Sequence, residues 1–353
     1  MNRSSVLLLN TWLTRLFLVT SLLSIIILPL QGSELNLDES GSPELTEEAS
    51  MAIQRGLKYL LKTQNEDGSW DAGGDAKGGR AVSTTSLALM AFMASAQFPG
   101  FGKYGKELEK AKEFLMKKAR SRSDGYLGTT MYEHGLATLA LSEIWGMTKT
   151  KEDDDAVQDA LEKAVDVIKR SQNPGGGWRY QPVADGGEDS SVTAMVFIAL
   201  ASARQAGIMV ENEIISKFQK YCVTSVDAKS GGHSYAPNGN GGTSIPCTAG
   251  MSYAAQLAGL RGTESVNGAI RLLKEQESIF TKVGHYYYCH YYAIQTMVQA
   301  GDKEYAYWYP QIRDALVSKQ APDGSWEKKH SYSTPIAVII LSTPHRYIPI
   351  YQR

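Results

Sequence analysis

Two kinds of helical pattern alternate along most of the chain. The first kind is amphipathic, and in residues 103–121 the side chains of Glu107 and Lys110 belong to its charged face. Such a helix keeps one side in water. The second kind is apolar or built from small residues nearly all round, as in residues 82–97, VSTTSLALMAFMASAQ. A helix of that composition is typically buried on most sides. The alternation predicts hairpins in which an outer helix packs on an inner one.

Six such hairpins follow one another along the sequence. The predicted pairs are 47–64 with 82–97, 103–121 with 131–146, 153–172 with 189–206, 211–225 with 244–259, 263–278 with 287–300, and 303–320 with 331–343. No segment alternates with a period of two for long, so strands are expected only as short pairings in loops. The fold class is therefore all-α, with six inner helices inside a ring of six outer ones. An open solenoid of the same hairpins is the alternative.

A short motif recurs at the end of three predicted outer helices. The copies read RGLKYLLKTQNEDGSW at 55–70, KAVDVIKRSQNPGGGW at 163–178 and QIRDALVSKQAPDGSW at 311–326. Each copy ends in Gln, three residues, Gly, one residue and Trp. We expect the Gln to cap the end of its own helix, where carbonyl groups are unpaired. The Gly allows a tight turn, and the Trp packs beneath it with its N–H bonded back. The motif is therefore interpreted as structural.

This motif resembles the QW repeat of squalene–hopene and oxidosqualene cyclases. The first copy satisfies the whole QW pattern through Arg55, Gly56, Tyr59, Leu60, Gln64, Gly68 and Trp70. The second copy has Val167 at the aromatic position, and the third keeps only the second half of the pattern. The resemblance covers about residues 47–343 and is greatest to exported bacterial proteins with prenyltransferase/squalene oxidase repeats. It implies the (α/α)6 toroid of the terpenoid cyclase and protein prenyltransferase superfamily.

The chain departs from those families at their reactive motifs. The cyclases carry an Asp-x-Asp-Asp acid motif, whereas the nearest segment here, residues 188–194, keeps one Asp, Asp189, and a Thr-Ala pair but not the carboxylate cluster. The zinc element Asp-x-Cys of prenyltransferases is absent because Asp189 is followed by serines. The Cys-Gly-Glu-Gln run of thioester domains is absent as well. The resemblance therefore predicts the fold more firmly than an activity.

Candidate catalytic residues lie where the inner helices begin. In a toroid these helix starts share one rim, and their free N–H groups and dipoles favour an anion there. Asp189 is the candidate proton donor, oriented by His134, and Glu133 with His134 is a candidate acid/base pair. Helix capping by Asp189 is the structural alternative. For Glu133 the alternatives are a buried ion pair or a charge at a helix start.

Candidate ligand contacts surround the same rim. They are Thr84, Ser190, Tyr287, Tyr291, Trp178 and Arg179. Tyrosines are dense between residues 286 and 292. Facing a cavity, they could stabilise a carbocation by cation–π contact, stack on a sugar, or simply fill the core.

No cofactor is predicted. The N and S ligands that zinc prefers are represented by Cys247, Cys289 and His290. Adjacent Cys and His on a helix point about 100° apart, from the helical period, which is poor spacing for one metal ion. With Cys222 the chain has three cysteines, an odd number that allows at most one disulfide bridge and leaves one free thiol. Buried cysteines commonly act as small apolar residues.

The net charge and the N-terminal segment bear on nucleic-acid binding and on the cellular location. Lys and Arg number 36 against 37 Asp and Glu, so the chain lacks the basic excess of a nucleic-acid-binding protein. A basic start, the apolar run 16–30 and small residues near Gly32 give residues 1–32 the order of a secretory signal peptide. An uncleaved signal anchor, with membrane association through this segment, is the alternative. Residues 33–46 are expected to be a flexible lead-in, and residues 47–353 a single barrel domain in an exported protein, in the periplasm, at the cell surface or secreted.

Three functions remain open from the sequence. The first is a cyclase-like or prenyltransferase-like toroid that acts on, or binds, an isoprenoid or other apolar small molecule in a central cavity. The second is a non-catalytic binding or scaffold module. The third is a polysaccharide-active (α/α) barrel enzyme, in which two carboxylates would flank a sugar cleft.

Overall fold

Helices make up the regular structure of the described part of the chain. The computed structural model describes residues 45–71, 80–237, 242–327 and 332–352. These belong to one structural unit, residues 41–353, which is distinct from residues 1–40. The predicted signal segment 1–32 and nearly all of the lead-in 33–46 lie outside the described residues, so both remain predictions. Across the described ranges, no helix has the length and apolar character needed to span a membrane.

The six predicted hairpins are confirmed. The amphipathic helices are α2 (Glu47–Thr63), α4 (Gly105–Arg120), α6 (Lys151–Arg170), α8 (Asn212–Thr224), α10 (Glu264–Glu275) and α12 (Asp302–Lys319). The apolar helices are α3 (Ala81–Ala94), α5 (Met131–Ile144), α7 (Ser190–Ala206), α9 (Ile245–Ala255), α11 (Tyr286–Ala300) and α13 (Ser333–Leu341). A π-helical turn, η2 (Gln256–Leu260), continues α9, and the short 3-10 turns η3 (Thr343–His345) and η4 (Pro349–Tyr351) follow α13. Two isolated antiparallel bridges, Val226 with His233 and Ser234 with Thr243, are the strand-like pairings within the described residues.

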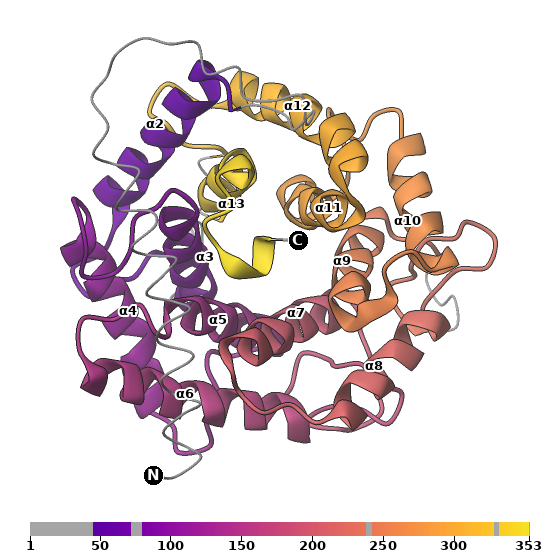
Figure 1. Cartoon of the computed structure of the whole chain (residues 1–353), viewed down its shortest axis with the longest axis horizontal. Helices are drawn as coiled ribbons and strands as arrows, with labels where there is room; N and C mark the ends of the chain where they lie inside the picture. Colours follow the sequence, from indigo (N-terminus) through magenta and orange to yellow (C-terminus); the bar gives the residue numbers. More distant parts are fainter. Residues whose placement is uncertain (1–44, 72–79, 238–241, 328–331, 353) are drawn as a thin grey trace, which may run out of the picture. The chain divides into compact units, whose positions relative to one another are not determined.

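The helices of this unit form two concentric rings (Figure 1). The apolar helices pack on one another in the order α3, α5, α7, α9, α11, α13, and α13 packs back on α3. The amphipathic helices surround them, and the last of these, α12, contacts the first, α2. The ring is therefore closed, as expected, and the open solenoid does not describe this unit. Burial explains the division, because α13 and most of α7 expose almost nothing to water.

Each Gln of the motif bonds to the following outer helix. Nε2 of Gln64 donates to the carbonyl of Gly68 (3.0 Å) and to that of Glu107 on α4 (2.8 Å). Nε2 of Gln172 donates to Gly176 (2.9 Å) and to Ile214 on α8 (3.0 Å). Gln64 is the C-cap residue of α2 as expected, but in both copies the side chain bonds to the turn and to the next outer helix instead of to carbonyls of its own helix.

The third copy closes the ring in the same way. Nε2 of Gln320 donates to the carbonyl of Gly324 (3.0 Å) and to that of Ala52 on α2 (2.8 Å). Its Oε1 also accepts from Nε of Arg55 on α2 (2.9 Å). The turn of the third motif copy is thus tied to the first outer helix by a glutamine, the residue that ties one outer helix to the next in the other two copies.

The motif glycine allows this close approach. Gly176 and Gly324 have φ of +97° and +91°, a conformation that side chains other than glycine rarely adopt. A Cβ at Gly176 would collide with the carbonyl of Lys217 on α8, and one at Gly324 with that of Arg55 on α2. The glycine is therefore needed both for the turn and for contact with the next outer helix.

The motif tryptophan joins its turn to both helices of its own hairpin. In Trp178 the indole Nε1 donates to the carbonyl of Ile168 on α6 (2.8 Å), and the backbone N–H donates to Oγ1 of Thr193 on α7 (2.8 Å). Trp70 and Trp326 make the same pair of bonds through Thr85 and Thr334. All three indoles are buried. The Gln, Gly and Trp of a copy are called the repeat clamp below.

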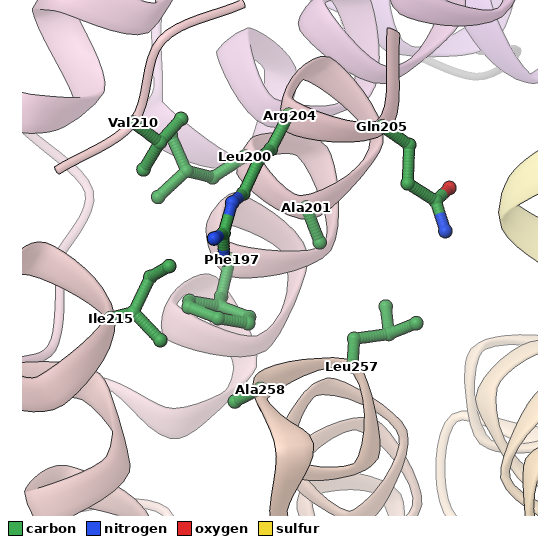
Figure 2. A pocket seen from close by; sticks show the side chains of 9 residues that line it. All are labelled: Phe197, Leu200, Ala201, Arg204, Gln205, Val210, Ile215, Leu257 and Ala258. Atoms are coloured by element: carbon green, nitrogen blue, oxygen red, sulfur yellow. The ribbon is translucent and has the colours of Figure 1, made fainter. Parts of the chain in front are cut away.

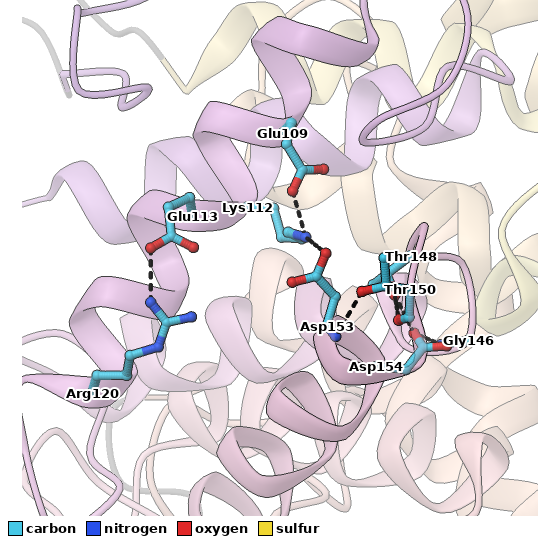
Figure 3. A network of polar contacts seen from close by, with 9 residues as sticks. All are labelled: Glu109, Lys112, Glu113, Arg120, Gly146, Thr148, Thr150, Asp153 and Asp154. Carbon is cyan, nitrogen blue, oxygen red and sulfur yellow. Dashed lines mark hydrogen bonds and ion pairs between the residues drawn. The ribbon is translucent and has the colours of Figure 1, made fainter.

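Ion pairs add a second link between outer helices. Nζ of Lys112 on α4 lies 2.5 Å from Oε1 of Glu109 and 3.5 Å from Oδ2 of Asp153 at the start of α6 (Figure 3). Oδ1 of Asp154 accepts from the N–H of Gly146 (3.0 Å), which fixes the loop between α5 and α6. The Lys112 ammonium is almost fully buried, so these carboxylates are its substitute for water.

We predict that Gln172→Ala lowers the free energy of unfolding by about 2–3 kcal/mol. The change removes two buried hydrogen bonds, each worth about 0.5–1.5 kcal/mol, and leaves the Ile214 carbonyl with fewer partners. Gln276→Ala is the matched control, because Gln276 donates only a long bond, 3.3 Å, to Leu272 of its own helix. Urea denaturation should show a loss below about 1 kcal/mol for the control. Equal losses in the two variants would contradict the clamp.

Candidate functional site

Asp189 caps the start of α7. Its Oδ1 accepts from the backbone N–H of Ser191 (2.8 Å) and of Val192 (3.1 Å), and from the Ser191 hydroxyl (2.5 Å). The capping alternative therefore describes Oδ1. The other oxygen, Oδ2, is buried and has no hydrogen-bond partner among the described residues. Its role as a proton donor stays a prediction.

Aromatic and thiol groups surround the Asp189 carboxylate. Burial, the Asp189 carboxylate and Tyr180 together raise the pKa of the Tyr235 hydroxyl far above its usual value. Burial raises the pKa of the Cys247 thiol to about 11, and the Asp189 charge adds to that rise. Burial is the main cause that raises the pKa of the Tyr288 hydroxyl, and neighbouring groups, which include Asp189, add to the rise. One carboxylate oxygen thus faces hydroxyl and thiol groups that remain protonated at neutral pH.

Two loops cross the starts of the inner helices and bring a tyrosine pair to the surface. The carbonyl of Tyr180 accepts from the N–H of Met131, the first residue of α5 (2.8 Å). The carbonyl of Tyr235 accepts from the N–H of Ser190, the first residue of α7 (2.9 Å). The hydroxyls of Tyr180 and Tyr235 lie 3.0 Å apart, and the side chains are 41% and 44% exposed. The N–H groups that we expected to attract an anion at α5 and α7 are thus already paired, which corrects that expectation for these two helices.

Glu133 behaves as a charge at the start of α5. Its Oε2 accepts from the backbone N–H (2.6 Å) and the hydroxyl (2.8 Å) of Thr129, while its own N–H donates to Oγ1 of Thr130 (3.2 Å). These reciprocal bonds are close to a capping box. The bonds occupy one carboxylate oxygen, and Oε1 is buried without a partner in the described structure. Glu133 and Asp189 thus have separate hydrogen-bond partners and cap different helices.

Both ring nitrogens of His134 bond to backbone. Nδ1 accepts from the N–H of Leu127 (3.0 Å), so Nε2 carries the proton that it donates to the carbonyl of Ala164 on α6 (2.9 Å). Burial lowers the pKa of this imidazole to about 4. In this arrangement neither nitrogen is directed at Asp189 or Glu133, and the ring ties α5 to α6.

Comparison of the hairpins shows what His134 replaces. In the first, third, fourth and sixth hairpins a threonine of the inner helix accepts from the backbone of the preceding turn: Thr85 from Trp70, Thr193 from Trp178, Thr248 from His233, and Thr334 from Trp326. In the second hairpin His134 accepts from Leu127 instead. The sequence interpretation missed this correspondence, although a threonine fifteen residues after Trp70, Trp178 and His233 is visible in the sequence.

The predicted ligand contacts are scattered. Thr84 donates to the carbonyl of Arg80 (3.1 Å), Ser190 shares a hydrogen bond with the Tyr221 hydroxyl (2.9 Å), and Trp178 belongs to the repeat clamp. Tyr287 is buried with its ring edge-on to that of Tyr286. Arg179 is exposed beside Tyr180. Of this set, Arg179 is the member that faces solvent, so the structure does not gather the set into one site.

Side chains fill the centre of the inner ring from one end. The Tyr132 hydroxyl on α5 lies 3.1 Å from that of Tyr292 on α11, although α5 and α11 are not neighbours in the ring. The Tyr132 and Tyr288 rings lie 6.2 Å apart. Burial raises the pKa of these hydroxyls far above the usual value. The contacts bridge opposite walls of the ring near the inner-helix starts.

The C-terminal segment turns toward the centre of the inner ring (Figure 1). The Tyr253 hydroxyl on α9 donates to the carbonyl of Ile350 (2.7 Å), and the hydroxyls of Tyr291 and Tyr351 lie 2.8 Å apart. Nε2 of Gln299 on α11 donates to the carbonyl of Gln352 (2.6 Å). The central cavity expected for an apolar ligand is thus occupied, at these two levels, by the protein's own side chains and tail.

The candidate zinc ligands are buried. His290 bonds through Nε2 to the carbonyl of Ile279 (3.0 Å) and is packed among Phe280, Tyr286 and Trp308. Burial raises the pKa of the Cys289 thiol to about 12, which opposes the thiolate that a metal ion needs. Within the described ranges, no three His, Cys, Asp or Glu side chains are grouped as metal ligands.

Solved structures share this fold at low sequence identity. No family model matches the chain, and no curated protein matches it. The α-1,6-mannanase GH76A of Salegentibacter sp. HEL1_6 aligns with 10% identity over 83% of this chain and 98% of its own, at a TM-score of 0.61. An inactive variant of that mannanase in complex with α-1,6-mannotriose aligns with 9% identity over 83% and 98%, at 0.60. The type II terpene cyclase MstE from Scytonema aligns with 16% identity over 87% and 100%, at 0.58. The chain therefore has the (α/α)6 toroid fold that both enzymes share.

Buried histidines should make the fold sensitive to acid. Burial lowers the pKa of His134, His233 and His290 to about 4, against about 6.5 in an unfolded chain. Between these pKa values the unfolded state binds more protons than the folded state. The contribution of these histidines to stability is therefore fully present above pH 6.5 and is lost as the pH falls toward 4. Each histidine contributes a slope of up to about 1.4 kcal/mol per pH unit. Urea denaturation between pH 7.5 and 4.5 should show this fall.

His134→Thr tests the contribution of one ring. The variant keeps an acceptor for Leu127, and its slope of stability against pH should decrease by up to ~1.4 kcal/mol per unit. Measurement at pH 8 gives the separate cost of the cavity that the smaller side chain leaves. A slope identical to that of the native chain would contradict the buried, neutral assignment of His134.

Asp189→Asn and Asp189→Ala separate capping from chemistry. Asparagine is as good an N-cap as aspartate, so Asp189→Asn should unfold within about 0.5 kcal/mol of the native chain. Asp189→Ala removes the acceptor for two backbone N–H groups and should cost about 1–2 kcal/mol. Thermal and urea unfolding of both variants provide the measurement. A large loss in Asp189→Asn would mean that the negative charge itself holds the rim together.

Proposed function

We propose that the protein is an exported, non-catalytic binding module whose ligand is a carbohydrate chain. The ligand-binding face is the rim formed by the loops over the starts of α5 and α7. The observation that carries the proposal is the contrast between a centre bridged by tyrosines and an exposed pair, Tyr180 and Tyr235, on the rim.

The filled centre weighs against a small molecule enclosed in the barrel. Cavities that enclose drug-sized ligands usually measure about 300–1,000 Å³ and are mostly apolar. Here the Tyr132–Tyr292 and Tyr291–Tyr351 contacts lie inside the ring, and burial keeps these hydroxyls protonated. A ligand is therefore expected to bind across the rim instead of within the ring.

The chemistry of the rim suits a sugar. Tyrosine offers a flat apolar face together with a hydroxyl that hydrogen-bonds, and a sugar ring has matching C–H faces and hydroxyls. Tyr180 and Tyr235 are held by their own carbonyls on the inner helices, so their positions are fixed before any ligand binds. Arg179, which precedes Tyr180 in sequence, is also exposed and adds a hydrogen-bond donor to the same loop. The mannanase likeness bears on the fold alone, and the tyrosine pair supplies the argument for carbohydrate.

Affinity electrophoresis through gels that contain soluble polysaccharides tests the proposal. Mannan, xylan and pectin are the probes, and at least one should retard the native chain. We predict that Tyr180→Ala and Tyr235→Ala each weaken that retardation at least tenfold, the equivalent of ~1.4 kcal/mol. Tyr307→Ala is the matched control, since Tyr307 is also 41% exposed but belongs to the outer helix α12. Equal retardation of Tyr180→Ala and the control would rule out the tyrosine rim.

A second function is favoured by the unpartnered Oδ2 of Asp189. A buried carboxyl group beside tyrosine hydroxyls is an arrangement used in general acid catalysis, and Tyr288 and Tyr235 lie around Asp189. In this alternative the substrate is an isoprenoid alkene, and neighbouring tyrosines stabilise the cation. Incubation with isoprenoid alkenes, followed by mass spectrometry for cyclised isomers, distinguishes it from the binding module. Product formed by the native chain and absent with Asp189→Asn would favour the enzyme.

A further inference from the structure

A groove lies between α7, α8 and the π-helical turn η2, near the end of α7 that is far from Asp189. Its volume is about 340 Å³, within the range of ligand pockets. It is lined by Phe197, Leu200, Ala201, Arg204, Gln205, Val210, Ile215, Leu257 and Ala258. Nearly all of these side chains are apolar, and one is a cation.

The floor and one wall of the groove are fixed by contacts outside it. The Phe197 ring stacks on that of Phe218 with centroids 3.7 Å apart and planes 11° from parallel. In η2 the chain leaves α-helical pairing, and Gly259 has a φ of +87°. Nε2 of Gln219 on α8 donates to the carbonyl of Ala258 (2.7 Å), which ties the turn to α8. π-Helical turns are rare and frequently mark functional positions.

Arg204 is the charged group of the groove. Figure 2 shows its side chain reaching from α7 toward Phe197, whereas the uncharged Gln205, which also lines the groove, points away from Arg204. The nearby carboxylates of Glu211 and Glu213 are paired with Lys169 and Lys217. Within the described residues Arg204 itself has no ion-pair partner. The guanidinium thus supplies an unneutralised positive charge beside an apolar surface.

We propose that this groove binds an amphiphile with one unbranched apolar chain and a terminal carboxylate. The chain lies against the partly exposed Ala201, Ile215 and Leu257, and the carboxylate pairs with Arg204. A guanidinium suits this head group because its N–H groups match the two carboxylate oxygens. The site is separate from the tyrosine rim and does not depend on the function proposed for it.

Calorimetric titration with a series of carboxylates tests the apolar part of the site. Hexanoate, octanoate and decanoate are used below their micellar concentrations. Each added methylene should tighten binding up to about fourfold until the groove is filled. Decanol should bind at least tenfold more weakly than decanoate, since it lacks the charge. Absence of decanoate binding, or equal binding of decanol, would overturn the proposal.

Two variants test the position of the site. Arg204→Gln should weaken decanoate about tenfold and remove the preference over decanol. Ala201→Phe places a ring in the groove and should weaken decanoate at least as much. Arg271→Gln is the control, since Arg271 lines a different groove, against α10. Circular dichroism and melting curves confirm that the variants are folded. Undiminished decanoate binding by folded Arg204→Gln or Ala201→Phe would refute this placement.

Discussion

The fold depends on the bond that the motif glutamine makes to the next repeat. A helical hairpin has no inherent reason to stop at six copies or to close, because each contact involves only its neighbours. Where the ring closes, the Gln320 side chain donates to the carbonyl of Ala52. The Gln172 side chain makes the same bond to the carbonyl of Ile214 between two consecutive outer helices. The glycine of each copy lets the two backbones approach, and the tryptophan fixes the turn to its own hairpin. Closure is therefore built from the interaction that propagates the ring.

This constraint determines which polar groups remain for chemistry. The starts of the inner helices carry Asp189, Glu133 and His134, the residue types expected at an acid–base site. In the structure the side chain of each of them bonds to backbone groups. Asp189 and Glu133 cap helices, and His134 replaces the threonine that accepts from the preceding turn in other hairpins. What is left is one buried oxygen on each carboxylate. A site that must bond to so many backbone groups retains little freedom to move protons, which is why the rim tyrosines carry more of the functional argument than the acids do.

The sequence predicted the helices well because their signal is local. Periodicity separated outer from inner helices, and the recurring Trp identified the turns, so the pairs agree with the structure to within a few residues. The partner of the glutamine could not be predicted, since it lies in the next repeat and the motif itself contains unpaired helix carbonyls. The tail within the ring was missed for a related reason. Nothing in the pattern of residues 343–352 states that Ile350 and Tyr351 meet Tyr253 and Tyr291 across the barrel. Long-range contacts of this kind depend on the closed ring, which a linear pattern does not display.

The distribution of clamps also bears on where ligands can bind. The fifth hairpin lacks the full motif, and Gln276 reaches no further than its own helix. By contrast, the third hairpin has the complete clamp of Gln172, Gly176 and Trp178. Ile214, whose carbonyl accepts from Gln172, precedes Ile215 of the apolar groove. Asp189 and Tyr180 follow the same clamp through Trp178 in sequence. A binding site gains affinity when its side chains are held in place before the ligand arrives. The rim and the apolar groove therefore both occur around α7, in the part of the ring where α6 is tied directly to α8.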